Sequence, residues 1–337
     1  MTVNNEELLA LSPSPHVKHK NTTQVVMRDV LIALAPAFIW SIIKFGIMAA
    51  VLTLLSVALC VFFEFAYQKV MKKPVTVSDL SAAVTGVLIA FNLPVTFKPW
   101  LLIFGCFFAI VIVKQLFGGI GKNVVNPAIA ARIFMFISWP IELSTFPEGH
   151  SSFLTGGLDS VTSATPLASL KNGTKPGFSI LDSFIGNVPG SLGEVSALLL
   201  AVGLVYLLVR RVITWHIPVS FILTVAVFAL IFPQAGLNSL QSVGYQLFSG
   251  GLFLGAIFMA TDYTTSPITN KGKIIAGIFC GVVTCVIRLW GSLPEGVSFS
   301  IILMNVFVPY FEDWTAPTPF GFVKEKKQKK AKEETKA

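Results

Sequence analysis

The segment MAAVLTLLSVALCVFFEFAYQ, residues 48–68, contains a single charged residue, Glu64. An apolar run of about 20 residues is long enough to cross the hydrocarbon core of a bilayer as a helix. The whole chain shares this character, because 54% of its 337 residues are hydrophobic and 12% are charged. This composition leaves too little polar surface for a soluble protein, so it predicts an all-α integral membrane protein.

Nine other apolar runs bring the number of candidate spans to ten. They lie near 29–46, 48–68, 80–95, 99–115, 124–140, 195–211, 217–233, 247–262, 273–290 and 296–311. The third is interrupted at residues 92–94, the fifth starts at an Asn-Pro pair (126–127), and the eighth fades into a polar run (261–267). Broken spans are tolerated only where protein or a cavity shelters the freed backbone groups.

The distribution of basic residues predicts the orientation of these spans. With the amino terminus inside, 19 of the 25 Lys and Arg residues fall on inner segments, including Lys114, and four on outer segments. Arg132 and Arg288 fall within spans. An excess of positive charge marks cytoplasmic segments. We therefore expect both termini to be cytoplasmic, and the net charge of +8 requires no nucleic-acid partner.

The polar interval 141–194 divides the candidate spans five and five, so the second set enters the membrane in the opposite sense, as an inverted repeat requires. Three residues recur 169 positions later, Gly86, Thr96 and Pro140 as Gly255, Thr265 and Pro309. We expect a cytoplasmic arm (1–28), a first five-helix repeat (29–140), an extracytoplasmic loop (141–194), a second repeat (195–311) and a basic cytoplasmic tail (312–337). No cleavable signal peptide is expected, because residues 1–24 are polar.

The cysteine pattern bears on redox chemistry. All four cysteines lie in apolar segments and none forms a C-x-x-C or other metal-ligand spacing: Cys60, Cys106, Cys280 and Cys285. They are expected to be packing residues rather than metal ligands. If electrons pass through this chain, an organic cofactor must carry them.

An attachment site for such a cofactor lies in the polar interval. Asp159, three intervening residues and then Ser163-Ala164-Thr165 resemble the motif at which bacterial flavin transferases join the phosphate of FMN to the last Thr hydroxyl. Thr165 is thus the expected point of attachment, with Asp159, Thr162, Ser163 and Ala164 as the surrounding motif. Pro166 is expected to disfavour helix at Thr165 and to keep the segment extended. The competing interpretation is a Ser/Thr-rich connecting loop.

Ionisable and amide groups near the broken spans are candidates for an ion pathway, because such groups are costly in a membrane unless they are partnered. Asn126, Asp262 and Glu295 are the three we select, since each lies where an interrupted helix would expose polar groups. Glu64, Arg132 and Arg288 are further functional candidates. Interfacial caps and ion pairs are the alternative interpretation, particularly for Glu64 and Asp262.

These features together resemble one family, which comprises the RnfD component of the Rnf ion-translocating ferredoxin:NAD oxidoreductase complex and the corresponding membrane component of the sodium-translocating NADH:quinone reductase. The resemblance runs from about Ser14 to Asp313, and the early first span favours the Rnf branch. The segments that carry it, in family order, are 14–16, 79–86, 114–119, 126–128, 159–167, 190–194, 259–262 and 294–296. Members often have Gly where Ser163 stands, and Ser is small enough for modification to be expected.

The resemblance implies more than the residues do by themselves. It implies a fold like that of urea transporters with two inverted five-helix repeats, covalent FMN on Thr165 at the extracytoplasmic face, and in some members a second, non-covalent riboflavin. It also implies a bacterial cell membrane location and partners that include a flavin transferase, membrane redox subunits and a second flavinylated subunit. Electron flow between ferredoxin and NAD would be coupled to Na⁺ or H⁺ export.

Two other functions remain open from the sequence. A redox-inactive channel or carrier for a small solute could be built on the same inverted repeat and would need no flavin. A membrane anchor for other subunits would also carry no flavin. Flavin that stays bound after denaturation distinguishes the first expectation from both.

Overall fold

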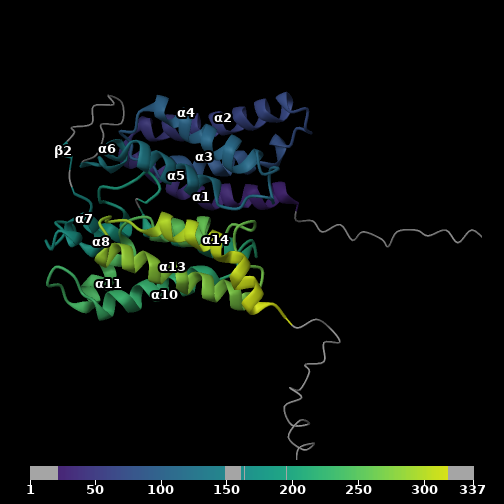
Figure 1. Ribbon diagram of the computed structural model, residues 1–337. Helices are drawn as coiled ribbons and strands as arrows, with labels where there is room; N and C mark the ends of the chain where they lie inside the picture. Colours follow the sequence, from purple (N-terminus) through teal and green to yellow (C-terminus); the bar gives the residue numbers. More distant parts are fainter. Residues whose placement is uncertain (1–21, 149–160, 163, 195, 318–337) are drawn as a thin grey trace, which may run out of the picture.

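The computed structural model describes residues 22–148, 161–162, 164–194 and 196–317. These residues are almost entirely helical, with a single antiparallel pairing of β1 (Pro147–Glu148) and β2 (Val161–Thr162). Two sets of helices form two layers, one above the other in Figure 1. The first set contains α1 (Thr23–Phe45), α2 (Ile47–Val70), η2 (Val77–Asp79), α3 (Ser81–Phe91), α4 (Pro99–Phe107), the π-helical η3 (Phe108–Gln115) and α5 (Pro127–Ser138).

The second set contains α9 (Ala197–Val209), α10 (His216–Ile231), α11 (Ser239–Phe248), α12 (Leu252–Leu254), the π-helical η4 (Gly255–Met259), α13 (Asn270–Trp290) and α14 (Val297–Thr315). Between the sets lie α6 (Pro140–Ser144), α7 (Pro166–Lys171) and α8 (Ile180–Ile185). The sets meet where α1 packs on α9 and α5 packs on α14.

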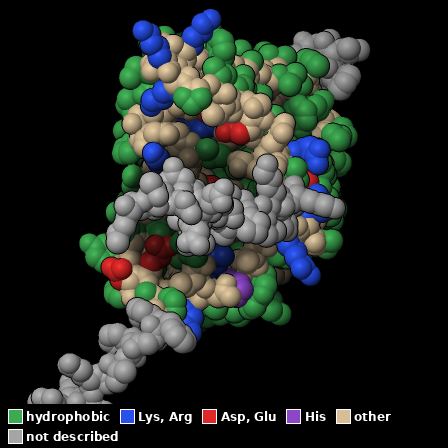
Figure 2. Space-filling model, turned by 90° about the vertical axis from the view of Figure 1, so that its right-hand side faces the viewer, with side chains coloured by type: hydrophobic (Ala, Val, Ile, Leu, Met, Phe, Trp, Pro, Cys, Tyr) green, Lys and Arg blue, Asp and Glu red, His purple; other side chains and the backbone are tan. Residues whose placement is uncertain are grey.

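The two ends of the molecule differ. The start of α1 and the end of α14 lie at one end, which we call the termini end, while α6, α7 and α8 lie at the other, which we call the loop end (Figure 1). Figure 2 views the termini end and shows basic side chains around its edge. Among the exposed basic residues of this end are Lys69, Lys72, Lys122, Arg210 and Lys271.

The helices have the character of a multi-pass membrane protein. By length and composition, α1, α2 and α13 can each cross a bilayer, and α11 with α12 and η4 forms a span bent by 61°. Five shorter apolar helices accompany them: Ser81–Phe91, Pro99–Gln115, Pro127–Ser138, Ala197–Val209 and His216–Ile231. Large apolar residues face outward, since Leu54, Val205 and Leu223 are 63, 59 and 60% exposed. The exact number of ten spans stays a prediction.

The expected span 247–262 differs from the structure. It contains the end of α11, a break at Ser249–Gly251 and the α12–η4 segment, and α11 already begins at Ser239. Hydropathy missed this first half because α11 carries Ser242 and Gln246, which are buried and polar. The break was therefore placed too late in the sequence.

The predicted break after α3 is confirmed, and the structure explains how its backbone is satisfied. Leu192 N donates to Leu93 O and Gly193 N donates to Phe91 O, each at 2.9 Å. Gly193 lies so close to the Phe91 side chain that a Cβ would overlap with it. The segment before α9 thus seals the end of the broken helix, as a non-helical backbone at membrane depth requires.

Two expectations about particular residues were wrong. Pro166 does not keep the chain extended but starts α7, because a proline at the first helical position removes only an N–H that would lack a partner anyway. Thr165 itself is extended, as predicted (φ −61°, ψ 154°), and caps α7. Lys114 is not a solvated inner charge, because its side chain is 2% exposed and pairs with Glu64.

Candidate functional site

A cavity of about 330 Å³ opens at the loop end between the two helix sets. Thr165 and Ala168 line it from α7, Arg132 and Phe136 from α5, and Phe299 from α14. Pockets for small molecules and cofactors begin near 300 Å³ and are usually apolar with a few fixed polar groups. The cavity meets this description, so it is large enough for a planar ring system.

Thr165 occupies its place in the cavity for local reasons. Its Oγ1 accepts a hydrogen bond from Ala168 N at 3.3 Å, which caps α7. Leu167 and Leu170 are buried against Tyr245 and anchor the helix. Lys171, at the end of α7, donates to Leu293 O at 2.7 Å and to Ile287 O at 3.3 Å. Both ends of α7 are therefore held against the second helix set.

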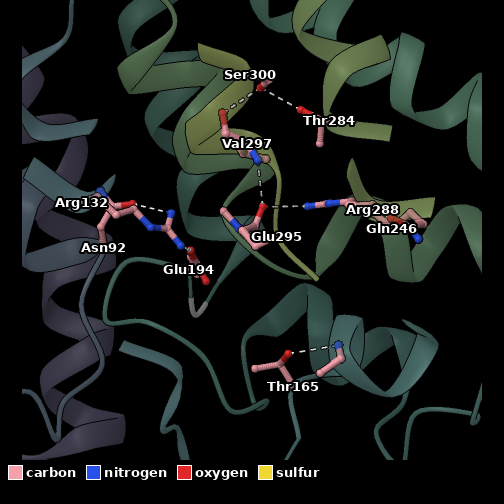
Figure 3. A network of polar contacts seen from close by, with 12 residues as sticks. Asn92, Arg132, Thr165, Glu194, Gln246, Thr284, Arg288, Glu295, Val297 and Ser300 are labelled. Carbon is pink, nitrogen blue, oxygen red and sulfur yellow. Dashed lines mark hydrogen bonds and ion pairs between the residues drawn. The ribbon is translucent and has the colours of Figure 1, made fainter. Parts of the chain in front are cut away.

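The cavity wall combines aromatic rings with one guanidinium group. Phe136 and Phe299 face each other edge to face, with ring centroids 6.4 Å apart. Arg132 Nη1 donates to Asn92 Oδ1 at 2.8 Å, and Arg132 Nη2 lies 3.1 Å from Glu194 Oε1 (Figure 3). This wall can pack an apolar ring and present a positive charge to an anionic group beside Thr165.

A second ion pair lies next to the first. Arg288 Nη2 lies 3.2 Å from Glu295 Oε1, and Arg288 Nη1 donates to Gln246 O at 2.7 Å (Figure 3). Glu295 also accepts from Gly251 N at 3.0 Å. A Cβ at Gly250, which has a φ of +74°, would overlap with Glu295. The break between α11 and α12 therefore needs glycine, for its backbone conformation and for its closeness to the ion pair.

The two carboxylates of these pairs respond differently to their surroundings. Burial raises the pKa of Glu194, although the charge of Arg132 opposes it. Burial also acts to raise the pKa of Glu295, but Arg288 and Arg132 outweigh it and hold that pKa below its usual value. Glu194 is thus the carboxylate of the two that binds a proton more readily.

A larger cavity, of about 510 Å³, lies at the termini end. Its polar lining includes Thr85, Lys114, Asn126 and Asp262. The Asp262 carboxylate accepts from Thr264 Oγ1 at 2.9 Å and from Thr265 Oγ1 at 3.2 Å. This cavity can therefore hold a ligand with both donor and acceptor groups.

Met259, at the end of η4, lies between the two cavities. Asn126, which lines the cavity at the termini end, donates from Nδ2 to Met259 O at 3.2 Å. Asn92, which lines the cavity at the loop end, has its Nδ2 3.7 Å from Met259 Sδ. The ends of the broken helices α3 and η4 thus form a thin layer that separates the two cavities.

The predicted site residues fall into three groups. Ala164, Thr165 and Glu295 line the cavity at the loop end, whereas Asn126 and Asp262 line the cavity at the termini end. The three ion-pathway candidates therefore do not form one site. Thr162 belongs to β2, and Asp159 and Ser163 lie outside the described residues.

Sequence reasoning missed several residues that the structure brings together. Glu194, Asn92 and Lys114 were not selected as site residues, although each is part of a polar network. Each of them stood beside a break or in an apolar run, which was the available signal. Among the functional candidates, Arg132 and Arg288 are paired as buried or nearly buried cations.

The fold and site define a multi-pass helical membrane protein with an aromatic, arginine-containing cavity beside a threonine hydroxyl at the junction of two helix sets. The chain belongs to the NQR2, RnfD, RnfE family, whose model matches residues 10–321. The resemblance inferred from the motifs is thereby confirmed.

Curated relatives cover nearly the whole chain. It is 46% identical over 332 residues to the D subunit of the Na⁺-translocating ferredoxin:NAD⁺ oxidoreductase complex of Acetobacterium woodii, and the match covers 97% of this chain and 100% of the relative. It is 37% identical to the D subunit of the proton-translocating ferredoxin:NAD⁺ oxidoreductase complex of Clostridium ljungdahlii, with 94% and 97% covered. It is 35% identical to the D subunit of the ion-translocating oxidoreductase complex of Aliivibrio salmonicida, with 93% and 99% covered.

Proposed function

We propose that this chain is an electron-transfer subunit of an ion-translocating ferredoxin:NAD⁺ oxidoreductase complex and carries FMN covalently on Thr165. The observation that carries the proposal is the position of Thr165 at a cavity with two aromatic rings and a guanidinium group. Relatives of nearly equal length are named as the D subunit of such complexes, which supports the activity of the whole assembly.

The residues at the cavity fit the proposed group. A phosphoester through Thr165 Oγ1 leaves that oxygen able to accept from Ala168 N, and Arg132 supplies a positive charge for an anionic ligand. Phe136 and Phe299 would pack against a planar ring system. When bound, the flavin supplies transfer of electrons singly or in pairs, which the charges and hydrogen bonds of the site would tune.

The proposed orientation places the termini end in the cytoplasm and the loop end outside. The exposed basic residues around the termini end support it, because positive charge gathers on the cytoplasmic side (Figure 2). In this orientation the two helix sets are inverted five-helix repeats, and Thr165 faces the compartment from which a flavin transferase would modify it. The partners are the other subunits of the complex, including a second flavinylated subunit and membrane redox subunits.

Ion transport is proposed to use the two cavities. Asn126 and Asp262 offer oxygen atoms at the termini end and Glu295 at the loop end. Relatives are named for Na⁺ and for proton translocation, so the transported ion is one of these two. Export against the membrane potential costs roughly 2.3 kcal/mol per charge for each 100 mV, which electron transfer must supply. The cavity at the termini end is also our candidate position for a non-covalent riboflavin.

The decisive test is the mass of the chain after co-expression with a flavin transferase. We expect an increase of one FMN on the peptide that contains Thr165, no increase in Thr165→Ala, and an unchanged increase in Thr174→Ala, a nearby exposed threonine. An unmodified wild-type peptide under conditions that flavinylate a known substrate would overturn the proposal.

A redox-inactive solute channel is the competing function, and the pair of cavities on either side of a thin layer favours it as the second candidate. Such a protein would give solute flux in liposomes with Thr165→Ala as well as with the wild type. A pure membrane anchor would give neither flavin nor flux, and the assembled complex would turn over normally with Thr165→Ala.

A further inference from the structure

The charges around the loop-end cavity are balanced before any ligand is counted. Arg132 is the only cation among the lining residues that the structure describes, and its partner is Glu194. Glu295 also lines the cavity, and its partner is Arg288. Two arginines thus face two carboxylates. An anionic group that enters this site, or an electron added to it, leaves an unbalanced negative charge in a place with little water.

Burial makes this imbalance costly. The side chains of Arg132 and Glu194 are 15% and 8% exposed, and those of Arg288 and Glu295 are 2% and 20% exposed. Charges interact more strongly in such surroundings than in water, and a buried charge without a partner is unfavourable. The site therefore gains stability if one of its carboxylates becomes neutral when an electron arrives.

Glu295 is poorly suited to that role. Its carboxylate accepts from Arg288 Nη2, Gly251 N and Val297 N, and protonation would weaken all three contacts. Glu194, in contrast, contacts a single described cation, Arg132, which also faces the cavity. When Arg132 is drawn toward a new negative charge in the cavity, Glu194 loses its only described cationic partner. Glu194 is therefore the weaker link of the network.

We propose that Glu194 binds a proton when the group on Thr165 gains an electron, and that Arg132 transmits the change between them. This inference rests on the proposed function, because it needs a redox group in the cavity. Glu194 is a charge-compensating residue rather than a catalytic one, since it contacts the cavity only through Arg132.

The step balances in charge and atoms. One electron comes from a one-electron reductant, a neighbouring redox carrier in the complex or dithionite in the test, and that reductant is oxidised as the cofactor is reduced. One proton leaves a hydronium ion in water at the loop end and forms an O–H bond with a carboxylate oxygen of Glu194. The charged groups that face Glu194 are Arg132 from α5 and Glu295 from the segment before α14, with Arg288 of α13 behind Glu295. The net charge of the site is unchanged.

The first readout is infrared difference spectroscopy on full-length flavinylated protein, reduced with dithionite in water and in D₂O. The wild type should gain the carbonyl band of a protonated carboxylic acid on reduction, shifted in D₂O. Glu194→Gln should lack this band, and Glu142→Gln, a more exposed carboxylate of the same end that pairs with Lys98, should keep it. A band that persists in Glu194→Gln, or that is lost in Glu295→Gln alone, overturns the proposal.

The second readout is the midpoint potential of the bound flavin as a function of pH. A tenfold change in proton activity corresponds to about 59 mV for one electron. Over the range in which Glu194 takes up its proton, the wild type should therefore fall more steeply than Glu194→Gln, by up to about 59 mV per pH unit. Equal slopes, or a potential that follows Na⁺ concentration and not pH, would contradict the assignment.

Two controls keep the result interpretable. Glu194→Asp retains a carboxylate and should retain a band at a shifted frequency, which covers the case in which Glu194→Gln does not fold. The mass of the Thr165 peptide is measured on every sample. A missing flavin refutes the proposed function, whereas a flavin without the Glu194 band refutes only this inference.

Discussion

Lys114 Nζ lies 2.8 Å from Glu64 Oε2 inside the first helix set, where the two side chains are 2% and 1% exposed. Gln115 Nε2 donates to the other carboxylate oxygen at 2.8 Å, and Lys114 also donates to Ser81 Oγ at 2.6 Å. The π-helical end of η3 thus directs two consecutive polar residues to one buried carboxylate. Lys114 also lines the cavity at the termini end, so this ion pair forms part of its wall.

Lys114→Met should destabilise the protein strongly, because it leaves the Glu64 carboxylate buried without its cation. The expected loss is about 3–5 kcal/mol in free energy of unfolding, measured by denaturation in detergent micelles. Replacing both residues, with Glu64→Leu and Lys114→Met, should recover most of this loss, since apolar pairs replace buried ion pairs well. Lys98→Met is the control, because the Lys98–Glu142 pair is exposed and should contribute only about 0–1 kcal/mol. Equal losses for Lys114→Met and Lys98→Met would contradict the assigned burial.

Gly193→Ala should open the seal at the end of α3. Its new methyl group would overlap with Phe91, and the displaced strand would lose its hydrogen bonds to Phe91 O and Leu93 O. Overpacking of this kind costs about 1–3 kcal/mol. Gly177→Ala is the matched control, because no atom lies within 4 Å of the position of its new methyl group. Thermal unfolding of both variants checks the prediction, which fails if their melting temperatures are equal.

The stability of the protein without flavin should depend on pH through Glu194. Burial raises the pKa of this carboxyl in the folded state, so the folded protein binds the proton more tightly than the unfolded chain. The stabilisation is present at low pH and is lost as the pH rises from the usual Glu value of about 4.5 through the raised pKa of the folded state. Glu194→Gln should flatten this part of the curve. Unfolding of Thr165→Ala with and without Glu194→Gln, at a series of pH values, measures the difference, and parallel curves would contradict it.

Lys171→Met should loosen α7 and with it Thr165. The lysine donates to carbonyls of Leu293 and Ile287, and an unsatisfied carbonyl costs about 1–3 kcal/mol. Amide hydrogen exchange in residues 166–171 should therefore become about tenfold faster or more. Lys175→Met, which changes an exposed lysine of the same segment, should leave the exchange unchanged. Similar exchange in the two variants would show that Lys171 does not hold the helix.

Local features of the fold were largely readable from the sequence. The break after Phe91, the start of α5 at the Asn126 cap and the extended backbone of Thr165 follow from Pro, Asn and Thr at particular positions. The helical start at Pro166 was misjudged, because the same proline disfavours helix for the residue before it and favours helix for the residues after it. A polar helix such as α11 was hidden from any search for apolar runs.

The contacts that build the candidate site could not be read from the sequence. Arg132 meets Asn92 and Glu194, which are 40 and 62 positions away, only because α3, α5 and the segment before α9 come together at the end of a broken helix. Hydropathy assigns each of these residues to a span or a loop but does not pair them. For the same reason Lys114 looked like a solvated charge, although Glu64 neutralises it from another helix.

The thin layer at Met259 also has an electrical consequence. Water that enters the two cavities brings each aqueous phase close to this layer, so most of the transmembrane voltage would fall across Asn92, Met259 and Asn126 rather than across the full bilayer. A charge that passes this layer would do nearly all of its electrical work there, roughly 2.3 kcal/mol for each 100 mV. The layer acts as a short dielectric gap, and substitutions within it should change the voltage dependence of turnover more than substitutions elsewhere along either cavity.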